Sequence, residues 1–286
     1  MQADAAGRGT GFAAALLRQL ERFAQRAALP RVRALHLPAE PGPDAARGEF
    51  CALELADGSL GLSYVLLDDT LARLRALQPM ADLAGADALS LARRFLDCSA
   101  APRTLGFAAA NALCACLYRR AGWSPPASAD SLGGLDPRPG DEIGMIGLFT
   151  PLVPRLLASG ARLTVVELKP HLAGTHDGWR VTLDADALRA CDKVIATGTL
   201  VLNDSLDAML ERCSGARHVA LVGPSMGCFP DALFARGVTL MGGSWVEDGA
   251  AYADALRRGE PHPKTARKVA IVPAGYPGFE ALLERV

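Results

Sequence analysis

The sequence predicts an α/β protein in which a parallel sheet with helices on both faces follows a smaller α+β domain. In the second half, continuous apolar runs alternate with helical segments, which is the pattern of parallel strands buried on both faces. In the first half, short β-like runs stand together between helical segments, as in an α+β domain. The stretch Ser124–Asp141 between the halves holds four Pro and three Gly, so it cannot be one regular element.

The first half begins with an amphipathic helix that carries apolar residues from Phe12 to Phe23 on one face and stops at Pro30. The dipeptide Asp57-Gly58 predicts a hairpin between two β-like runs. The last helical run is apolar almost all round, which predicts a buried helix. Strands are expected at Val32–Leu37, Phe50–Leu55 and Leu60–Leu67, and further helices at Leu71–Leu77, Leu89–Leu96 and Thr104–Arg120.

The second half is typical of a Rossmann-like domain. Thr150-Pro151 predicts a capped helix start, and Gly160 and Gly237 follow expected helix ends. We therefore expect an N-terminal domain at residues 1–128, a linker at 129–141 and the Rossmann-like domain at 142–286. Strands are expected at Ile143–Gly147, Arg162–Glu167, Lys193–Thr197, His218–Gly223 and Val238–Gly242, and helices at Thr150–Ser159, Ala185–Cys191, Asn203–Cys213, Pro230–Arg236 and Glu247–Arg257.

Composition and charge narrow the functional class. Thirty Lys and Arg residues against 31 Asp and Glu give a net charge of −1, which argues against a strongly basic nucleic-acid surface. No apolar run approaches the roughly 18–20 residues of a membrane span, and Met1–Gly11 has no signal-peptide pattern. The seven cysteines are odd in number and include no CxxC pair, so reduced thiols and a cytoplasmic location are expected.

Open parallel sheets bind ligands at the carboxyl ends of their strands. Small and polar residues gather after the expected strand ends of this sequence, where backbone amides can approach a ligand closely. Together with Asn111 from the first half, these residues form the predicted ligand-binding cleft. Its members are Asn111, Gly147, Phe149, Glu167, Thr197, Gly198, Thr199, Asn203, Gly223, Pro224, Ser225, Gly242 and Gly243.

Glu167 lies twenty positions after Gly147, at the end of the second expected strand of this half. A dinucleotide-binding domain carries its ribose-binding acid at this place. The glycine fingerprint GxGxxG is absent, and Pro151 and Pro154 remove amides that a pyrophosphate would use, so a standard NAD site is not expected. Glu167 could instead ligate a hard metal ion, hold a substrate amine, or simply face solvent at a strand end.

Two asparagines leave alternatives open. Asn203 either caps the helix that follows it or contacts a ligand, and the two roles are compatible. Asn111 interrupts an apolar helix, where an unpaired buried amide costs about 1–3 kcal/mol. It either bonds to backbone within the first domain or faces the second domain across a shared cleft.

The candidate metal ligands are Glu167, His171, His176 and Cys228, which could hold a transition-metal ion. The spacing of the first three matches no standard ligand pattern. Two loop histidines that occur by chance, and a packed thiol at Cys228, are the competing interpretation.

The second half resembles the heavy-metal chelation domain, a bacterial and archaeal family. The first half is similar to the small domain that accompanies it, whose fold is like the N-terminal domain of enolase. The resemblance implies metal chelation in a cleft between the two domains, on which Asn111, Glu167, Thr197, Thr199, Asn203 and Ser225 would converge. The matching segments are Gly144–Phe149, the strand ending in Glu167, Asp192–Thr199 with Asn203, Val222–Ser225, Pro230–Phe234, Gly237-Val238 with Gly242-Gly243, and Leu105–Leu113 in the first half.

Three functions follow as hypotheses. The first is a metal-handling protein that binds a metal or a small metal complex in the cleft. The second is an enzyme that uses an adenine-containing cofactor or substrate there, such as S-adenosylmethionine or a nucleotide. The third is a structural or regulatory subunit with a vestigial cleft. The expected partner is a metal ion or small molecule, not nucleic acid or a membrane, and assembly into a homo-oligomer is left open.

Overall fold

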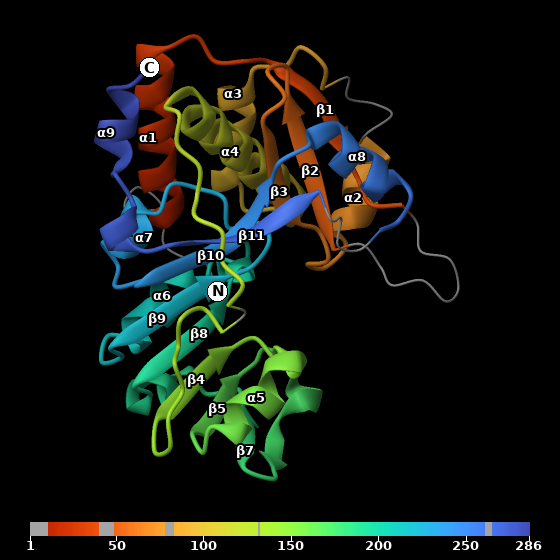
Figure 1. The fold of residues 1–286 in the computed structure, drawn as a ribbon. Coiled ribbons are helices and arrows are strands. Elements are labelled where there is room, and N and C mark those ends of the chain that lie inside the picture. The colour runs from red at the N-terminus through yellow and green to blue at the C-terminus, as the bar shows by residue number, and fades with distance from the viewer. Residues whose placement is uncertain (1–10, 40–48, 78–82, 131, 261–264) are drawn as a thin grey trace.

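Two sheets organise the computed structural model, which describes residues 11–39, 49–77, 83–130, 132–260 and 265–286 (Figure 1). Apart from Gly11, the stretch Met1–Gly11, in which no signal peptide is expected, lies outside these residues. None of the helices in the described ranges has the length and apolar composition needed to cross a bilayer.

The smaller sheet is an antiparallel meander of β1 (Val32–His36), β2 (Phe50–Leu55) and β3 (Leu60–Tyr64). The expected hairpin joins β2 to β3, and Gly58 in its turn takes a left-handed φ of +83°. The helical elements of this half are α1 (Phe12–Arg26), α2 (Thr70–Leu77), α3 (Ala88–Ala92), the 3-10 turn η2 (Arg93–Leu96) and α4 (Ala100–Arg120).

The helix α4 packs on the meander and is buried along nearly its whole length, as its apolar sequence predicts. The approach between α4 and β3 is so close that it requires a glycine. A Cβ atom on Gly61 would lie 2.1 Å from the carbonyl oxygen of Ala108, so any other residue would push the strand off the helix.

Across the described residues, the larger sheet has eight strands in the order β11-β10-β9-β8-β4-β5-β7-β6. Its central strands are parallel, and the edge strands β11 and β6 pair antiparallel. The chain runs from β4 outward to β5 and β7 and then returns to β8 on the other side of β4. This reversal creates a topological switch point between β4 and β8, where open α/β sheets bind ligands. The strands are β4 (Glu142–Ile146), β5 (Arg162–Val166), β6 (Gly174–His176), β7 (Trp179–Thr182), β8 (Lys193–Thr197), β9 (His218–Val222), β10 (Leu240–Val246) and β11 (Ala266–Ile271).

Both faces of the larger sheet are covered, because side chains alternate along each strand. In β8, Ile195 joins the core that contains α5 (Val153–Ala158), whereas Val194 and Ala196 join the opposite core. The expected α/β class, with a mostly parallel sheet flanked by helices, is therefore confirmed. The remaining helical elements are η3 (Thr150–Leu152), η4 (Pro170–Leu172), η5 (Ala185–Ala190), η6 (Gly198–Val201), α6 (Leu206–Arg212), α7 (Asp231–Phe234), α8 (Gly249–Arg257), η7 (Pro273–Gly275) and α9 (Phe279–Leu283).

The structure differs from the sequence-based expectation at several elements. Strands β6, β7 and β11 were not expected, and the helix expected at Ala185–Cys191 is a 3-10 helix. The helix expected from Asn203 begins only at Leu206, because the Asn203 side chain accepts hydrogen bonds from Ser205 and holds the chain in a turn there.

The two halves of the chain are interleaved. One continuous hydrophobic core contains residues from both, and α8 packs against the outer face of the meander (Figure 1). Helices α1 and α9, from opposite ends of the chain, lie side by side (Figure 1). The expected linker is also packed, since Leu132 and Leu135 are buried under the larger sheet. The boundaries at residues 1–128, 129–141 and 142–286 stay a prediction.

Candidate functional site

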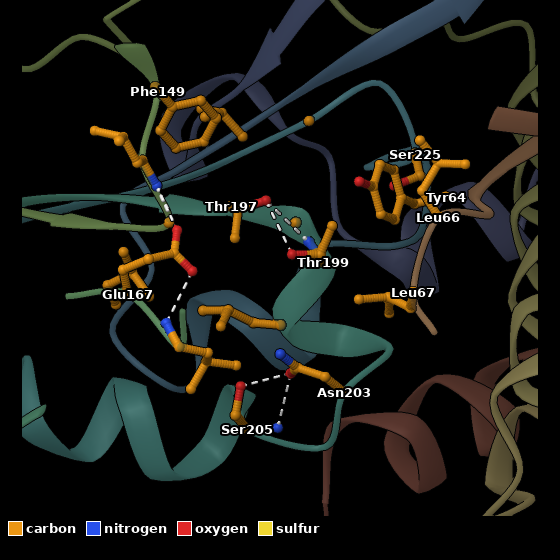
Figure 2. A pocket seen from close by; sticks show the side chains of 18 of the residues that line it. Tyr64, Leu66, Leu67, Phe149, Glu167, Thr197, Thr199, Asn203, Ser205 and Ser225 are labelled. Atoms are coloured by element: carbon orange, nitrogen blue, oxygen red, sulfur yellow. Dashed lines mark hydrogen bonds between the residues drawn. The ribbon is translucent and has the colours of Figure 1, made fainter. Parts of the chain in front are cut away.

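A pocket of about 420 Å³ opens at the carboxyl ends of β4, β5, β8 and β9, on both sides of the switch point. We call it the cleft pocket, because residues from both halves line it. Figure 2 shows Glu167 and Phe149 on one side of the pocket, Tyr64 and Leu66 on the other, and Thr197 between them.

The Glu167 carboxylate is fixed by the backbone of two neighbouring loops. Gly147 leaves β4 with a left-handed φ of +79°, and this turn brings the amide of Leu148 to within 3.1 Å of Glu167 Oε2. The amide of Leu168 donates to Oε1 at 2.8 Å. Each carboxylate oxygen can accept more than one hydrogen bond, so the half-buried Glu167 can still receive donors from a ligand.

The chain after β8 supplies hydroxyl and amide groups. The hydroxyls of Thr197 and Thr199 share a hydrogen bond of 3.1 Å, and the Thr197 oxygen also accepts the amide of Thr199. Asn203 Oδ1 accepts the amide and the hydroxyl of Ser205 at 3.2 and 2.6 Å. Within the described residues no acceptor meets Asn203 Nδ2, and because the residue is half-buried this group can donate to a ligand or to water.

The wall from the N-terminal half is aromatic and apolar. The rings of Phe50 and Tyr64 meet edge to face, with centroids 5.6 Å apart, and Leu66 and Leu67 extend the wall. Burial and, secondarily, the Glu49 carboxylate raise the pKa of the Tyr64 phenol, which therefore stays protonated at neutral pH. This wall can stack against a flat ring and offer it one hydroxyl.

The lining as a whole is apolar with a few polar groups. Its charged members are Glu49, Glu167 and Lys169, and no His or Cys is found among the described residues that line it. The full lining is Glu49, Phe50, Tyr64, Leu66, Leu67, Ile146, Gly147, Leu148, Phe149, Val166, Glu167, Leu168, Lys169, Thr197, Gly198, Thr199, Leu200, Asn203, Ser205, Met209, Val222, Gly223, Pro224 and Ser225.

Most of the residues predicted for the cleft come together in this pocket. Gly242 and Gly243 instead line an adjoining hollow of about 150 Å³, and Asn111 lies in a small cavity behind Ser225. The predicted residues that do line the cleft pocket are Gly147, Phe149, Glu167, Thr197, Gly198, Thr199, Asn203, Gly223, Pro224 and Ser225.

The sequence-based reasoning missed the contribution of the N-terminal half, notably Glu49, Phe50 and Tyr64. The strands β2 and β3 carry no local pattern that marks a site. Only the docking of the halves brings the rings of these strands to the sheet edge. Lys169 could have been predicted from the sequence, because it follows Glu167 by two positions.

The four candidate metal ligands do not form one site. His171 is exposed in η4, and the His176 ring stacks on Trp179 with centroids 4.2 Å apart. Cys228 is fully buried, and burial raises the pKa of its thiol to about 12. A protonated thiol is a poor metal ligand. In the part of the chain that the structure describes, no three His, Cys, Asp or Glu side chains come together as a metal site.

The other buried thiols show the same property. Burial raises the pKa of Cys51, Cys116 and Cys213 to about 12, and that of Cys191 to about 11. Because no three such donors come together among the described residues, their donor set does not fit a bare soft metal ion held by thiolate and imidazole.

The fold and the cleft pocket define an α/β protein with two sheets and a pocket of small-molecule size that residues from both halves of the chain line. A family profile described as "Putative heavy-metal chelation" matches residues 131–274, just over half of the chain, and a second profile of the same description matches residues 47–114. The chain belongs to this family, as the resemblance noted in its sequence implied.

Two solved structures of the same family share the fold. A protein of unknown function from Desulfitobacterium hafniense is 21% identical, with a TM-score of 0.66 over 90% of this chain and 98% of the other. A protein of unknown function from Pyrococcus horikoshii is 19% identical, with a TM-score of 0.63 over 90% of this chain and 99% of the other. A comparison with curated proteins gives no match.

Proposed function

We propose that this protein binds a small organic ligand in the cleft pocket and handles metal as a complex with that ligand, not as a bare ion. The observation that carries the proposal is the lining of the pocket. Its volume of about 420 Å³ lies within the range of about 300–1,000 Å³ typical of small-molecule sites. The family description supplies the link to metal.

The polar groups of the pocket are suited to an organic molecule with hydroxyl or amine donors. Glu167 accepts such donors, and the hydroxyls of Thr197 and Thr199 and the amide of Asn203 complete a polar edge. The apolar walls bury the body of the ligand, and an aromatic part of it stacks on Phe50 or Tyr64. The metal keeps the donor atoms of its own organic chelator.

Native mass spectrometry of untagged protein, purified without chelators, tests the proposal. We expect a mass excess equal to an organic molecule together with a metal. In Glu167→Gln the excess disappears, whereas in Glu284→Gln it remains, because Glu284 lies at the end of α9 and does not line the pocket. An excess that both variants keep would place the ligand elsewhere and overturn the proposal.

Titration with a bare metal ion distinguishes direct binding of the ion from binding of a metal complex. Calorimetry with ZnCl₂ and NiCl₂ should show no stoichiometric binding to the apo protein, since the described donors do not converge. If either bare ion binds tightly and Glu167→Gln abolishes this binding, the proposal is contradicted and direct chelation of the ion by the protein is favoured.

A second candidate is an enzyme that uses an adenine-containing cofactor or substrate in the same pocket. The position of Glu167 favours it, because a carboxylate after the second strand beside the switch point binds ribose hydroxyls in nucleotide-binding sheets. The six-residue helix α5, with Pro154 at its start, offers few amides to a pyrophosphate. A nucleoside or S-adenosylmethionine therefore suits the site better than NAD.

Thermal unfolding in the presence of adenosine, S-adenosylmethionine, NAD or ATP distinguishes this candidate. Adenosine or S-adenosylmethionine should raise the Tm of the wild type and of Glu284→Gln but not of Glu167→Gln. No rise with any of the four compounds would eliminate the second candidate and leave the first untouched.

A further inference from the structure

Behind the wall of the cleft pocket lies a much smaller cavity of about 20 Å³. Its walls come from β3, α4, the turn after β9, and β10, so it sits between the two halves of the chain. Ser225 lines both this cavity and the cleft pocket. We call it the Asn111 cavity, defined by Leu62, Asn111, Arg119, Ser225, Gly227 and Ser244.

The amide of Asn111 joins the two halves. Its Nδ2 donates to the carbonyl oxygens of Leu62 and Ser225, each at 2.8 Å, and the side chain is buried. Both partners are pure acceptors, so they fix the orientation of the amide with nitrogen toward them and oxygen away. Asn111 thus ties β3 to the turn that backs the cleft pocket. It bonds to backbone of its own half, as one expectation had it, and it contacts the second half directly and not across the cleft pocket.

The oxygen of the same amide lacks a donor. No described residue donates to Asn111 Oδ1, although the residue is only 2% exposed. Buried polar atoms of this kind are paired with protein or with ordered water in the great majority of cases. The cavity that Asn111 lines, at about 20 Å³, exceeds the roughly 10–15 Å³ that one water molecule needs. The serine residues Ser225 and Ser244 line the same space and can supply further polar contacts.

We propose that one buried water molecule occupies the Asn111 cavity and donates a hydrogen bond to Asn111 Oδ1. The water completes the bonding of the amide whose nitrogen holds the Ser225 turn. It therefore belongs to the framework that fixes the back wall of the cleft pocket, and this inference does not depend on which ligand that pocket binds.

The variant Gly227→Ala tests this directly. A Cβ on Gly227 would meet nothing nearer than Asn111 Oδ1 at 3.9 Å and its Cγ at 4.0 Å, so a methyl group would fill space on the oxygen side of this amide. If the cavity is dry, the substitution stabilises the protein slightly, because alanine restricts the unfolded chain. If the methyl displaces a water, Oδ1 loses its donor, and we expect the unfolding equilibrium constant to rise about tenfold, or about 1.4 kcal/mol.

The matched control is Gly275→Ala, where the added Cβ would lie 3.9 Å from Val272 Cγ2 and within 4 Å of no buried polar atom that lacks a hydrogen-bond partner. Urea unfolding should show this variant unchanged or slightly more stable than the wild type. The loss in Gly227→Ala should vanish in an Asn111→Leu background. A Gly227→Ala protein as stable as the control, or a loss that persists without Asn111, overturns the proposal.

A crystal structure of the wild type gives a test that needs no second variant. It should show an ordered water about 2.7–3.2 Å from Asn111 Oδ1, and the Gly227→Ala structure should lack it. Density that leaves the wild-type cavity empty would refute the inference, even if Asn111→Leu did not fold.

Discussion

The substitution Lys193→Met should destabilise the protein by about 3 kcal/mol at pH 7. Lys193 Nζ donates to Asp141 Oδ2 at 2.7 Å, and the two side chains are only 7% and 10% exposed. Breaking a buried ion pair by removing one partner costs about 3–5 kcal/mol. The lower end applies here, because Arg217 and the amide of Arg138 still hold the Asp141 carboxylate.

The pH dependence gives the same prediction a second readout. The hydrogen bond from Lys193 is the main cause that lowers the pKa of Asp141 from 3.8 to about 2. A carboxyl whose pKa is depressed in the folded state stabilises it fully above the unfolded pKa, and this stabilisation is lost as the pH falls toward about 2. The free-energy gap between wild type and Lys193→Met should therefore narrow between pH 4 and pH 2.

Urea unfolding followed by circular dichroism at a series of pH values measures both effects. Arg217→Met is the matched control, since the Arg217 side chain is 58% exposed and a pair of this kind contributes less than about 1 kcal/mol. A Lys193→Met protein within about 1 kcal/mol of the wild type at pH 7, or a gap that keeps its size in acid, would refute the reasoning.

Three further predictions follow from other contacts. Gly61→Ala should lose at least about 2 kcal/mol in urea unfolding, because its Cβ would overlap the backbone of α4; stability equal to the wild type would contradict that close approach. Phe107→Ala should lose about 3–5 kcal/mol by the same assay, since the ring is fully buried; a loss below about 1 kcal/mol would mean the core collapses around it. In the native protein a thiol reagent should label Cys98, the exposed cysteine, and reach Cys228 only after unfolding; early labelling of Cys228 would disprove its burial.

The larger sheet was predictable where its strands are buried on both faces. β8 and β9 are continuous apolar runs, and this pattern has few other interpretations. The edge strands β6 and β11 were not predicted, because neither is a continuous apolar run. β6 is three exposed residues long, and β11 carries Arg267 and Lys268 among its apolar residues.

The candidate site was predictable as far as strand order determines it. Glu167, Thr197 and Ser225 follow parallel strands, so their carboxyl ends meet at one edge of the sheet. The wall around Tyr64 depends on how the halves dock, and the sequence near it carries no sign of that. His176 shows the converse, because this histidine lies only nine positions after Glu167 in the sequence and yet stacks on Trp179 in the β6–β7 hairpin.

The interleaving of the halves has a consequence for how a ligand enters. Proteins that close around a ligand by a hinge motion have two domains that rotate about a few linking residues. Here α8 packs on the meander and α9 packs on α1, so elements of the second half contact elements of the first half. Such a rotation would disrupt the hydrophobic core that the two halves share. The opposing walls of the cleft pocket are thus held at a set separation. The ligand proposed above would therefore enter a site that is already formed.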